Sequence, residues 1–334
     1  MRMETLHLRA DDRGIAAAAD ILRRGGLVAF PTETVYGLGA NALDRGAVLR
    51  IFEAKQRPRW DPIIVHGTSV EMLRTLVREW PTSAEALARV YMPGPLTLLL
   101  PKRDIVPMEC TAGRDKVGVR IPSHPVALAL IRAAGLPIAA PSANRFGHTS
   151  PTTAEHVLAD LDGRIDAVLD GGPTDVGVES TVIDVTVEPP VIYRPGGISR
   201  EMIETVIGPV TIAQRPLTDA PAESLESPGL GLRHYAPRAR LFLVHGREEF
   251  TATVVNQRGT RIGVMLPDGW DGPELRDALK FAWGAIEDVD LLAHNLYEGL
   301  RSLDEQKADV IVCPVPRTDG VGLAILDRLT KAAK

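Results

Sequence analysis

Aromatic residues, cysteines and surplus basic charge are all scarce in this sequence. Aromatic side chains make up 4% of its 334 residues, and the formal net charge is −5. Both values argue against a protein that binds nucleic acid mainly by stacking or bulk charge, although a local basic cleft is still allowed. No stretch approaches the roughly 18 apolar residues that span a bilayer, and the N-terminus has no apolar signal region. We therefore expect a cytoplasmic protein without membrane contact.

The two cysteines, Cys110 and Cys313, are far apart and lack metal-ligand spacing. We expect both to be buried thiols. The hydrophobic fraction of 45% and the charged fraction of 24% are typical of an ordinary globular protein. Because 334 residues exceed the usual size of one domain, two domains are the starting expectation.

Short apolar strands alternate with amphipathic helices in the first part of the chain, which predicts an α/β domain over residues 1–212. Residues 213–239 contain several prolines and no apolar periodicity, so we expect a linker there. Residues 240–334 carry apolar strands at 240–245, 261–266 and 309–313, separated by helix-like stretches, which predicts a small parallel α/β domain of Rossmann-like type. The expected helices of the first domain cover 15–24, 45–56, 70–79, 83–90 and 125–134, and its strands cover 27–30, 63–65, 96–100, 117–121, 136–140, 167–169, 180–185 and 191–194.

The stretch from Lys55 to His66 brings cations and an imidazole to the junction of a helix and a strand. Lys55 and Arg57 stand at the C-terminal end of the helix, where they either complement the helix dipole or bind an anion. His66 follows strand 63–65, where it is either a structural residue or a residue that contacts a bound ligand. Arg120 lies within another short apolar strand and needs an anionic partner, because burying an unpaired arginine is costly. A guanidinium at that place suits a carboxylate fork.

Further polar residues follow the strands. Ser142 and Asn144 come directly after strand 136–140, at the strand end where α/β sheets bind ligands. Ser150, followed by proline, predicts the N-cap of another helix. The segment Gly37-Leu38-Gly39 is either a tight turn or a place where the backbone approaches a ligand. It is not a dinucleotide-binding fingerprint, because a third glycine and a helix start are missing.

The sequence contains no Gly-rich phosphate-binding loop that ends in lysine followed by serine or threonine, and no catalytic-triad motif is recognisable in it. A phosphate would therefore be held by side chains such as Lys55, Arg57 and Arg194, together with a divalent ion. The residues by themselves predict a cationic, hydroxyl-lined cleft for a small polyanion.

Several motifs occur in a defined order along the chain. They are Pro31 to Gly39, Lys55-Gln56-Arg57-Pro58, the strand ending in His66, Pro93-Gly94-Pro95-Leu96-Thr97, Pro141-Ser142-Ala143-Asn144, Ser150-Pro151-Thr152, Glu179-Ser180-Thr181 and Ser227 to Pro237. This set resembles the YrdC-type threonylcarbamoyl-adenylate synthases. The resemblance extends over nearly the whole chain, because the linker and the second domain resemble the longer, two-domain form of that family.

The resemblance implies a twisted, open mixed sheet with a concave cationic cleft. It also implies a nucleotidyltransferase that condenses L-threonine, bicarbonate and ATP to threonylcarbamoyl-AMP and pyrophosphate. A separate tRNA threonylcarbamoyl transferase would then use the product to modify tRNA. Mg²⁺ is the implied cofactor, bound through the ATP phosphates with Ser142 and Asn144 as candidate protein ligands.

By similarity, the catalytic residues are Lys55 and Arg57. The positions assigned to ATP are Lys55, Arg57, Asp61, Thr111, Ser142, Asn144, Ser150, Arg194, His234 and Tyr235. The positions assigned to threonine are Thr34, His66, Arg120, Ala140 and Ser180.

Arg233, His234 and Tyr235 are adjacent in a linker that would not need them as a mere tether. A carbamate and a mixed anhydride are both vulnerable to water, so we expect a cover over the site. We hypothesise that these three residues fold back as that cover.

Two other classes of protein fit part of the pattern. One is an RNA-binding module that uses the basic cleft, in which case tRNA contact would tighten at low salt. The other is a carbamoyl-adenylate-forming maturation factor for hydrogenase assembly, but the acylphosphatase and zinc-binding segments of such proteins are absent from this sequence.

Overall fold

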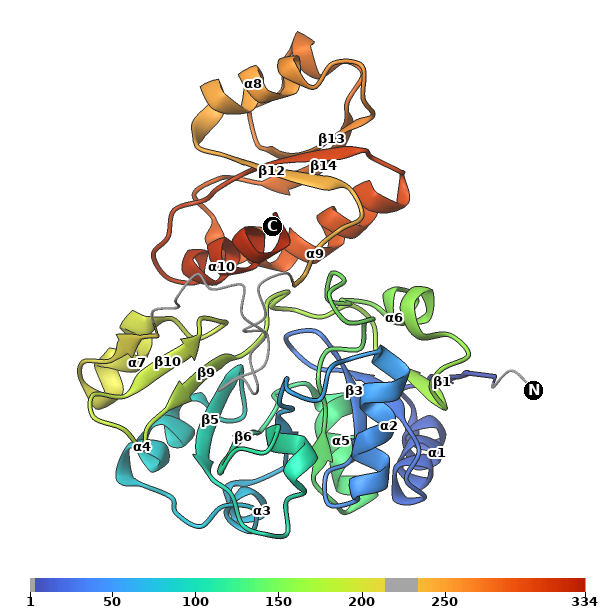
Figure 1. The fold of residues 1–334 in the computed structure, drawn as a ribbon, viewed down its shortest axis with the longest axis vertical. Coiled ribbons are helices and arrows are strands. Elements are labelled where there is room, and N and C mark those ends of the chain that lie inside the picture. Colours follow the sequence, from blue (N-terminus) through green and yellow to red (C-terminus); the bar gives the residue numbers. More distant parts are fainter. Residues whose placement is uncertain (1–3, 214–233, 334) are drawn as a thin grey trace.

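The structure, a computed structural model, describes residues 4–213 and 234–333. Within these ranges the chain forms an 11-stranded mixed sheet and a separate four-stranded parallel sheet, both accompanied by helices (Figure 1). The expected α/β class, with a large mixed sheet and a small parallel one, is confirmed. Both cysteines are free and fully buried, as expected, and burial raises the pKa of the Cys110 thiol to about 12.

The large sheet has the strand order β1-β8-β2-β3-β7-β4-β6-β5-β9-β10-β11. Its strands are β1 Leu6–Arg9, β2 Val28–Pro31, β3 Tyr36–Asn41, β4 Val65–His66, β5 Leu96–Pro101, β6 Lys116–Arg120, β7 Ile138–Ala139, β8 Ala167–Asp170, β9 Thr181–Asp184, β10 Val191–Arg194 and β11 Thr211–Ile212. The helices around it are α1 Asp12–Arg23, α2 Arg45–Lys55, α3 Val70–Arg74, α4 Thr82–Tyr91, the 3₁₀ turn η1 Met108–Thr111, α5 Pro125–Ala134, α6 Ala154–Leu161 and α7 Arg200–Ile207.

The first hairpin differs from the expected turn. Strands β2 and β3 pair antiparallel around residues 32–35, so the tight-turn alternative for Gly37-Leu38-Gly39 is wrong and these residues lie inside β3. The hydroxyl of Thr32 stabilises the actual turn by donating to the carbonyl of Val35 at 2.6 Å. Gly39 is small for a packing reason, since a Cβ there would lie 2.8 Å from the ring of Phe30.

Two helix predictions also need correction. Ser150 does not cap a helix: α6 begins at Ala154 and its cap is Thr153, whose hydroxyl accepts the N–H of His156 at 3.3 Å. The expected helix over 70–79 ends at Arg74 in the structure. There the backbone turns to pair with β5, as the N–H of Arg78 donates to the carbonyl of Pro101 at 2.9 Å.

The small sheet has the order β12-β15-β13-β14. The expected strands near 240, 261 and 309 are present, whereas β14, which lies at the edge of the sheet and carries Lys280 among its apolar residues, was not predicted. The elements are β12 Arg240–Val244, α8 Gly246–Asn256, β13 Ile262–Pro267, the 3₁₀ turn η2 Pro273–Leu275, β14 Leu279–Gly284, α9 Val289–Glu305, β15 Val310–Pro314 and α10 Gly322–Ala332. Within the described ranges, no helix has the length and apolar character needed to cross a bilayer.

Helices α9 and α10 lie between the small sheet and the first domain (Figure 1). The hydrophobic cluster around α9 extends across this boundary, because Val35 and Val178 of the first domain belong to it together with Leu292 and Leu296. The two domains therefore share a continuous apolar contact.

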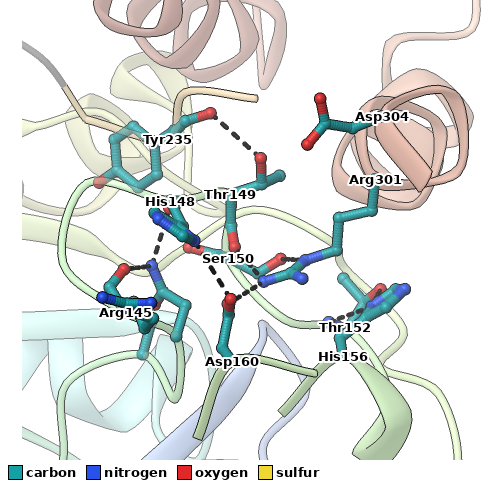
Figure 2. A network of polar contacts seen from close by, with 12 residues as sticks. Arg145, His148, Thr149, Ser150, Thr152, His156, Asp160, Tyr235, Arg301 and Asp304 are labelled. Carbon is teal, nitrogen blue, oxygen red and sulfur yellow. Dashed lines mark hydrogen bonds and ion pairs between the residues drawn. The ribbon is translucent and has the colours of Figure 1, made fainter. Parts of the chain in front are cut away.

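A polar network adds to this contact (Figure 2). Arg301 of α9 donates to the carbonyls of Thr149 and Ser150 and pairs with the carboxylate of Asp160 in α6 at 2.7 Å. Burial raises the pKa of Asp160, but the hydrogen bond from His148 and the Arg301 guanidinium outweigh it and bring this pKa to about 2. The network thus anchors the segment that follows Asn144 to the second domain.

Replacing Arg301 with methionine is expected to lower the free energy of unfolding by about 3 kcal/mol, because it leaves the largely buried Asp160 carboxylate without its guanidinium partner. Urea denaturation at pH 7 measures this loss. The double substitution Arg301→Met with Asp160→Asn should recover part of it, since no charge is then left unpaired. A single substitution that left the stability unchanged would contradict the assigned role.

Candidate active site

A cavity lies where the ends of several central strands of the large sheet meet His234 and Tyr235, at the end of the linker. Its volume is about 50 Å³, which is small against the ~300 Å³ or more of common ligand pockets. The lining residues are Thr32, Thr34, Val35, Gly37, Arg57, Ile64, His66, Arg120, Ala140, Pro141, Ser142, Glu179, Ser180, Arg194, His234 and Tyr235.

Arg57 reaches the cavity from the loop after α2. That helix is capped by Asp44 and ends at Lys55, and the following residue, Gln56, adopts a left-handed conformation with φ 54°. The guanidinium of Arg57 is fixed from behind, by hydrogen bonds to the carbonyls of Asp61 and Pro62 at 3.2 and 2.6 Å and by an ion pair with the Asp61 carboxylate at 3.0 Å. A guanidinium held in this way is preorganised for an anion.

Lys55 lies behind the cavity wall. Its side chain is 1% exposed, and its ammonium donates to the carbonyls of Ser142, at 2.6 Å, and of Asn144. Burial, and then the neighbouring Arg57, lower the pKa of Lys55 well below its usual value. The two carbonyls stabilise the ammonium form, so Lys55 fixes the loop that presents Ser142 to the cavity.

His66 and Arg120 are brought together by strand pairing. They are register partners in the parallel pair β4–β6, so their side chains project from the same face of the sheet. Arg120 donates to the hydroxyl of Thr34 at 3.2 Å and pairs with Glu33 at 2.7 Å, which is the anionic partner its buried position requires. Burial and the Arg120 charge lower the pKa of His66 to about 3, so this imidazole is neutral at pH 7.

Farther along the sheet, Arg194 at the end of β10 donates to the carbonyl of Ser180 at 2.9 Å and to its hydroxyl at 3.0 Å. The Ser180 hydroxyl also bonds that of Thr97 at 2.8 Å. Glu179, the preceding residue, accepts from the hydroxyl of Ser150 at 2.7 Å. A second cation therefore faces the cavity beside a buried carboxylate.

His234 and Tyr235 form the remaining wall, and Arg233 lies outside the described residues. The His234 ring packs edge to face on Phe146, with ring centroids 5.5 Å apart. Burial, Arg57 and Lys55 lower its pKa well below the usual value, so the ring is neutral. The Nδ1 atoms of His66 and His234 are buried without a hydrogen-bond partner among the described residues. Both are suited to bind a polar ligand.

The structure thus gathers most of the residues proposed from the sequence around one cavity. Lys55, Asp61 and Ser150 stand behind its wall, each bonded to a lining residue or to its backbone. Asn144 also stands behind the wall, where its carbonyl accepts from the ammonium of Lys55. Thr111 is separate: it lies in η1, and its hydroxyl donates to the carbonyls of Met108 and Arg114 at 3.2 and 2.7 Å. The roles assigned to these residues stay predictions.

Sequence reasoning missed some of the site. Thr32 lies within a quoted motif but was given no role, and Glu179 likewise. Tyr297 and Arg328, which hold Glu179 from the second domain, carried no signal at all, because a single tyrosine or arginine on a helix is ordinary in sequence.

Nearby carboxylates neutralise much of the positive charge that was expected in the cleft. Arg57 and Arg120 each pair with a buried carboxylate, and Glu179 stands near Arg194. Among residues 4–213 and 234–333, no group of three or more His, Cys, Asp or Glu side chains is placed to hold a metal ion. Because its arginines stand beside carboxylates, the cationic character of the cleft stays a prediction.

Two family models cover the chain. One, described as telomere recombination and representing Sua5, YciO and YrdC proteins, matches residues 20–196. The other, described as the C-terminal domain of threonylcarbamoyl-AMP synthase, matches residues 198–334.

The relatives agree with both matches. A threonylcarbamoyl-AMP synthase of Pyrococcus abyssi is 45% identical over 97% of this chain and 95% of its own length, and one of Bacillus subtilis is 47% identical over 98% and 95%. The crystal structure of P. abyssi Sua5 complexed with L-threonine superimposes with a TM-score of 0.91 at 44% identity, covering 98% of this chain and 97% of that one. The protein therefore belongs to the threonylcarbamoyl-AMP synthase family, in its long two-domain form.

Proposed function

We propose that the protein is a nucleotidyltransferase that condenses L-threonine, bicarbonate and ATP to threonylcarbamoyl-AMP, pyrophosphate and water. The observation that carries this proposal is a single cavity that joins two sets of side chains. Arg120, Thr34 and His66 form a set suited to an amino acid, whereas Arg57 and Arg194 form a set suited to phosphates. The L-threonine complex of the P. abyssi relative supports the first assignment.

Threonine would bind beside the β4–β6 pair. Arg120 can receive its carboxylate in a fork, in place of part of the contact with Glu33. The buried Nδ1 of His66 and the hydroxyls of Thr34 and Ser180 are the polar groups available to the amine and the side-chain hydroxyl. Ala140 supplies a small apolar wall against the threonine methyl group.

The chemistry needs alignment and charge neutralisation more than a covalent nucleophile. The threonine amine and bicarbonate give a carbamate and water. A carbamate oxygen then attacks the α-phosphorus of ATP, and pyrophosphate leaves. Arg57 and Arg194 would stabilise negative charge on the phosphoryl oxygens, and Lys55 would position the loop that carries Ser142.

The cavity residues fit Mg²⁺ that arrives with the nucleotide rather than a resident ion. Mg²⁺ prefers oxygen ligands and commonly keeps phosphates and water in its shell. The Ser142 hydroxyl lines the cavity and suits this need. Asn144 suits it less, because its amide nitrogen donates to the carbonyls of Arg145 and His148 and its Oδ1 lies 3.5 Å from the Lys55 ammonium. When bound, the ion would neutralise charge on the phosphates.

The cover hypothesis gains support from the position of His234 and Tyr235 in the wall of a cavity of about 50 Å³. A nucleotide needs more room than this volume offers, and outward movement of these two side chains would supply it. Closing again over the substrates would protect the carbamate and the mixed anhydride from water. The product, an activated anhydride, is suited to direct transfer to a tRNA threonylcarbamoyl transferase.

The experiment that tests the proposal measures pyrophosphate release with ATP, Mg²⁺ and bicarbonate over a panel of amino acids. Threonine is expected to give at least a ~100-fold higher kcat/KM than valine, because valine lacks the hydroxyl that the buried polar groups would bind. Serine should rank between them. Release that ignores the amino acid, or that proceeds without bicarbonate, would contradict the proposed reaction.

A further inference from the structure

We propose that Arg328, in the last helix of the second domain, is a positioning residue for the active site and holds three segments of the cavity wall in register. This inference rests on the proposed function. Arg328 is 1% exposed and lies in α10. Its Nε donates to the Glu179 carboxylate at 2.9 Å, and its Nη1 donates to the carbonyl of Pro195 at 2.8 Å. Its guanidinium carbon lies 5.4 Å from the ring centroid of Tyr235.

These three contacts reach segments that are distant in sequence. Glu179 directly precedes β9, Pro195 directly follows Arg194 at the end of β10, and Tyr235 belongs to the part of the wall formed by the end of the linker. The end of α10 adds a contact of its own, because the carbonyl of Lys331 accepts the N–H of His234 at 3.3 Å. One helix of the second domain therefore contacts two parts of the cavity wall, the β9–β10 end and the His234–Tyr235 segment.

The charge of Arg328 matters as much as its geometry. Burial raises the pKa of Glu179, but Arg328 and Arg194 outweigh it and hold this pKa below its usual value, so the carboxylate is ionised at pH 7. The same carboxylate accepts from the hydroxyls of Tyr297, at 2.9 Å, and of Ser150. It faces a cavity that is proposed to bind a polyphosphate. Without Arg328, its negative charge would oppose the nucleotide phosphates.

A purely structural role makes a different prediction. If Arg328 only joined the domains, its removal would lower stability without a specific effect on the nucleotide, as any interface residue would. His294 offers a matched control, because its ring bonds the carbonyl of Asp175 at 2.7 Å across the same interface and does not line the cavity.

The test is a double-mutant cycle on the full-length protein: unsubstituted, Arg328→Met, Glu179→Gln and the double variant. Steady-state pyrophosphate release gives kcat and KM for ATP and for threonine, calorimetry gives the Kd of ATP, and thermal unfolding gives Tm. Arg328→Met is expected to raise KM and Kd for ATP at least ~10-fold, with a smaller change in KM for threonine. The double variant should return to within ~3-fold of Glu179→Gln alone, since the Glu179 charge is gone and Asp327, which also pairs with Arg328, keeps Lys331 as a partner. His294→Ala should leave both ATP constants unchanged.

Additive effects in the cycle, or Arg328→Met with unchanged KM and Kd for ATP, would overturn the inference while leaving the proposed function intact. An unsubstituted protein that binds ATP but releases no threonine-dependent pyrophosphate would contradict the proposed function, and the Kd values would still decide the role of Arg328. If Arg328→Met does not fold, Arg328→Lys replaces it in the cycle. Lysine keeps the charge but not the fork, so it should raise the ATP constants by less than threefold if charge compensation dominates, and a larger rise would contradict that explanation.

Discussion

Replacing Arg57 with methionine is expected to lower kcat/KM for ATP about 1000-fold. The reason is that Arg57 is the cavity guanidinium fixed by two backbone carbonyls and Asp61, while its Nη1 makes no hydrogen bond within the described residues. A preorganised donor aimed at developing charge commonly contributes two to three orders of magnitude, about 3–4 kcal/mol of transition-state stabilisation. Threonine-dependent pyrophosphate release measures this loss.

The control for that substitution separates catalysis from folding. Removing Arg57 alone takes the guanidinium partner from the buried Asp61 carboxylate, which is expected to destabilise the protein by about 3–5 kcal/mol. In the double substitution Arg57→Met with Asp61→Asn, both charges are gone, so stability should recover while activity stays low. A double variant with normal activity would show that Arg57 is not part of the catalytic site.

Lowering the pH from 7 to 5 is expected to reduce the free energy of unfolding by about 4 kcal/mol through His66 and His156 alone. Burial and nearby arginines lower the pKa of His66 to about 3 and that of His156 to about 4. An unfolded histidine has a pKa of about 6.5, so below this pH the two histidines bind protons in the unfolded chain but stay neutral in the native protein. The contribution of the two neutral histidines to the free energy of unfolding is complete only above pH ~6.5. It is lost as the pH falls toward 4, at up to ~1.4 kcal/mol per pH unit for each histidine.

Urea denaturation at half-unit pH steps measures that slope. The variant His156→Gln should reduce the slope of the free energy of unfolding against pH by ~1.4 kcal/mol per pH unit between pH 5 and 6, which corresponds to about one proton fewer taken up on unfolding. The variant His245→Gln, at a solvent-exposed position, makes the same substitution and serves as the control for its general effects. Equal slopes in His156→Gln and the starting protein would contradict the view that His156 is held neutral by burial.

Local pattern was a good guide wherever one segment determined its own structure. Helix α5 begins at Pro125 and ends at Ala134, as expected from the proline at its start and the glycine after its end. The pattern failed where partners elsewhere in the chain decide the outcome. Ser150 has the sequence of a helix cap, but its hydroxyl bonds Glu179. Strand β14 exists through its pairing with β13 at the edge of the small sheet.

The site follows the same division. The motifs identified most of the residues that line the cavity, because phosphate and carboxylate recognition require cations and hydroxyls that are unusual beside buried strands. The motifs could not separate residues that face the cavity from those behind its wall. Lys55 and Arg57 are two residues apart, yet Arg57 lines the cavity and Lys55 lies behind its wall. The left-handed Gln56 between them and the carbonyls of Ser142 and Asn144, which accept from the lysine, decide this difference.

The sequence by itself determined the α/β class, the division into a large and a small domain, and the family, since these depend on periodicity and on the order of motifs. The tertiary structure alone decided which distant residues meet. It paired His66 with Arg120 through strand register, and it set Tyr297 and Arg328 of the second domain against Glu179 of the first. The physical reason is that hydrogen bonds and ion pairs form between neighbours in space, and those neighbours are fixed only when the strands pair and the domains pack.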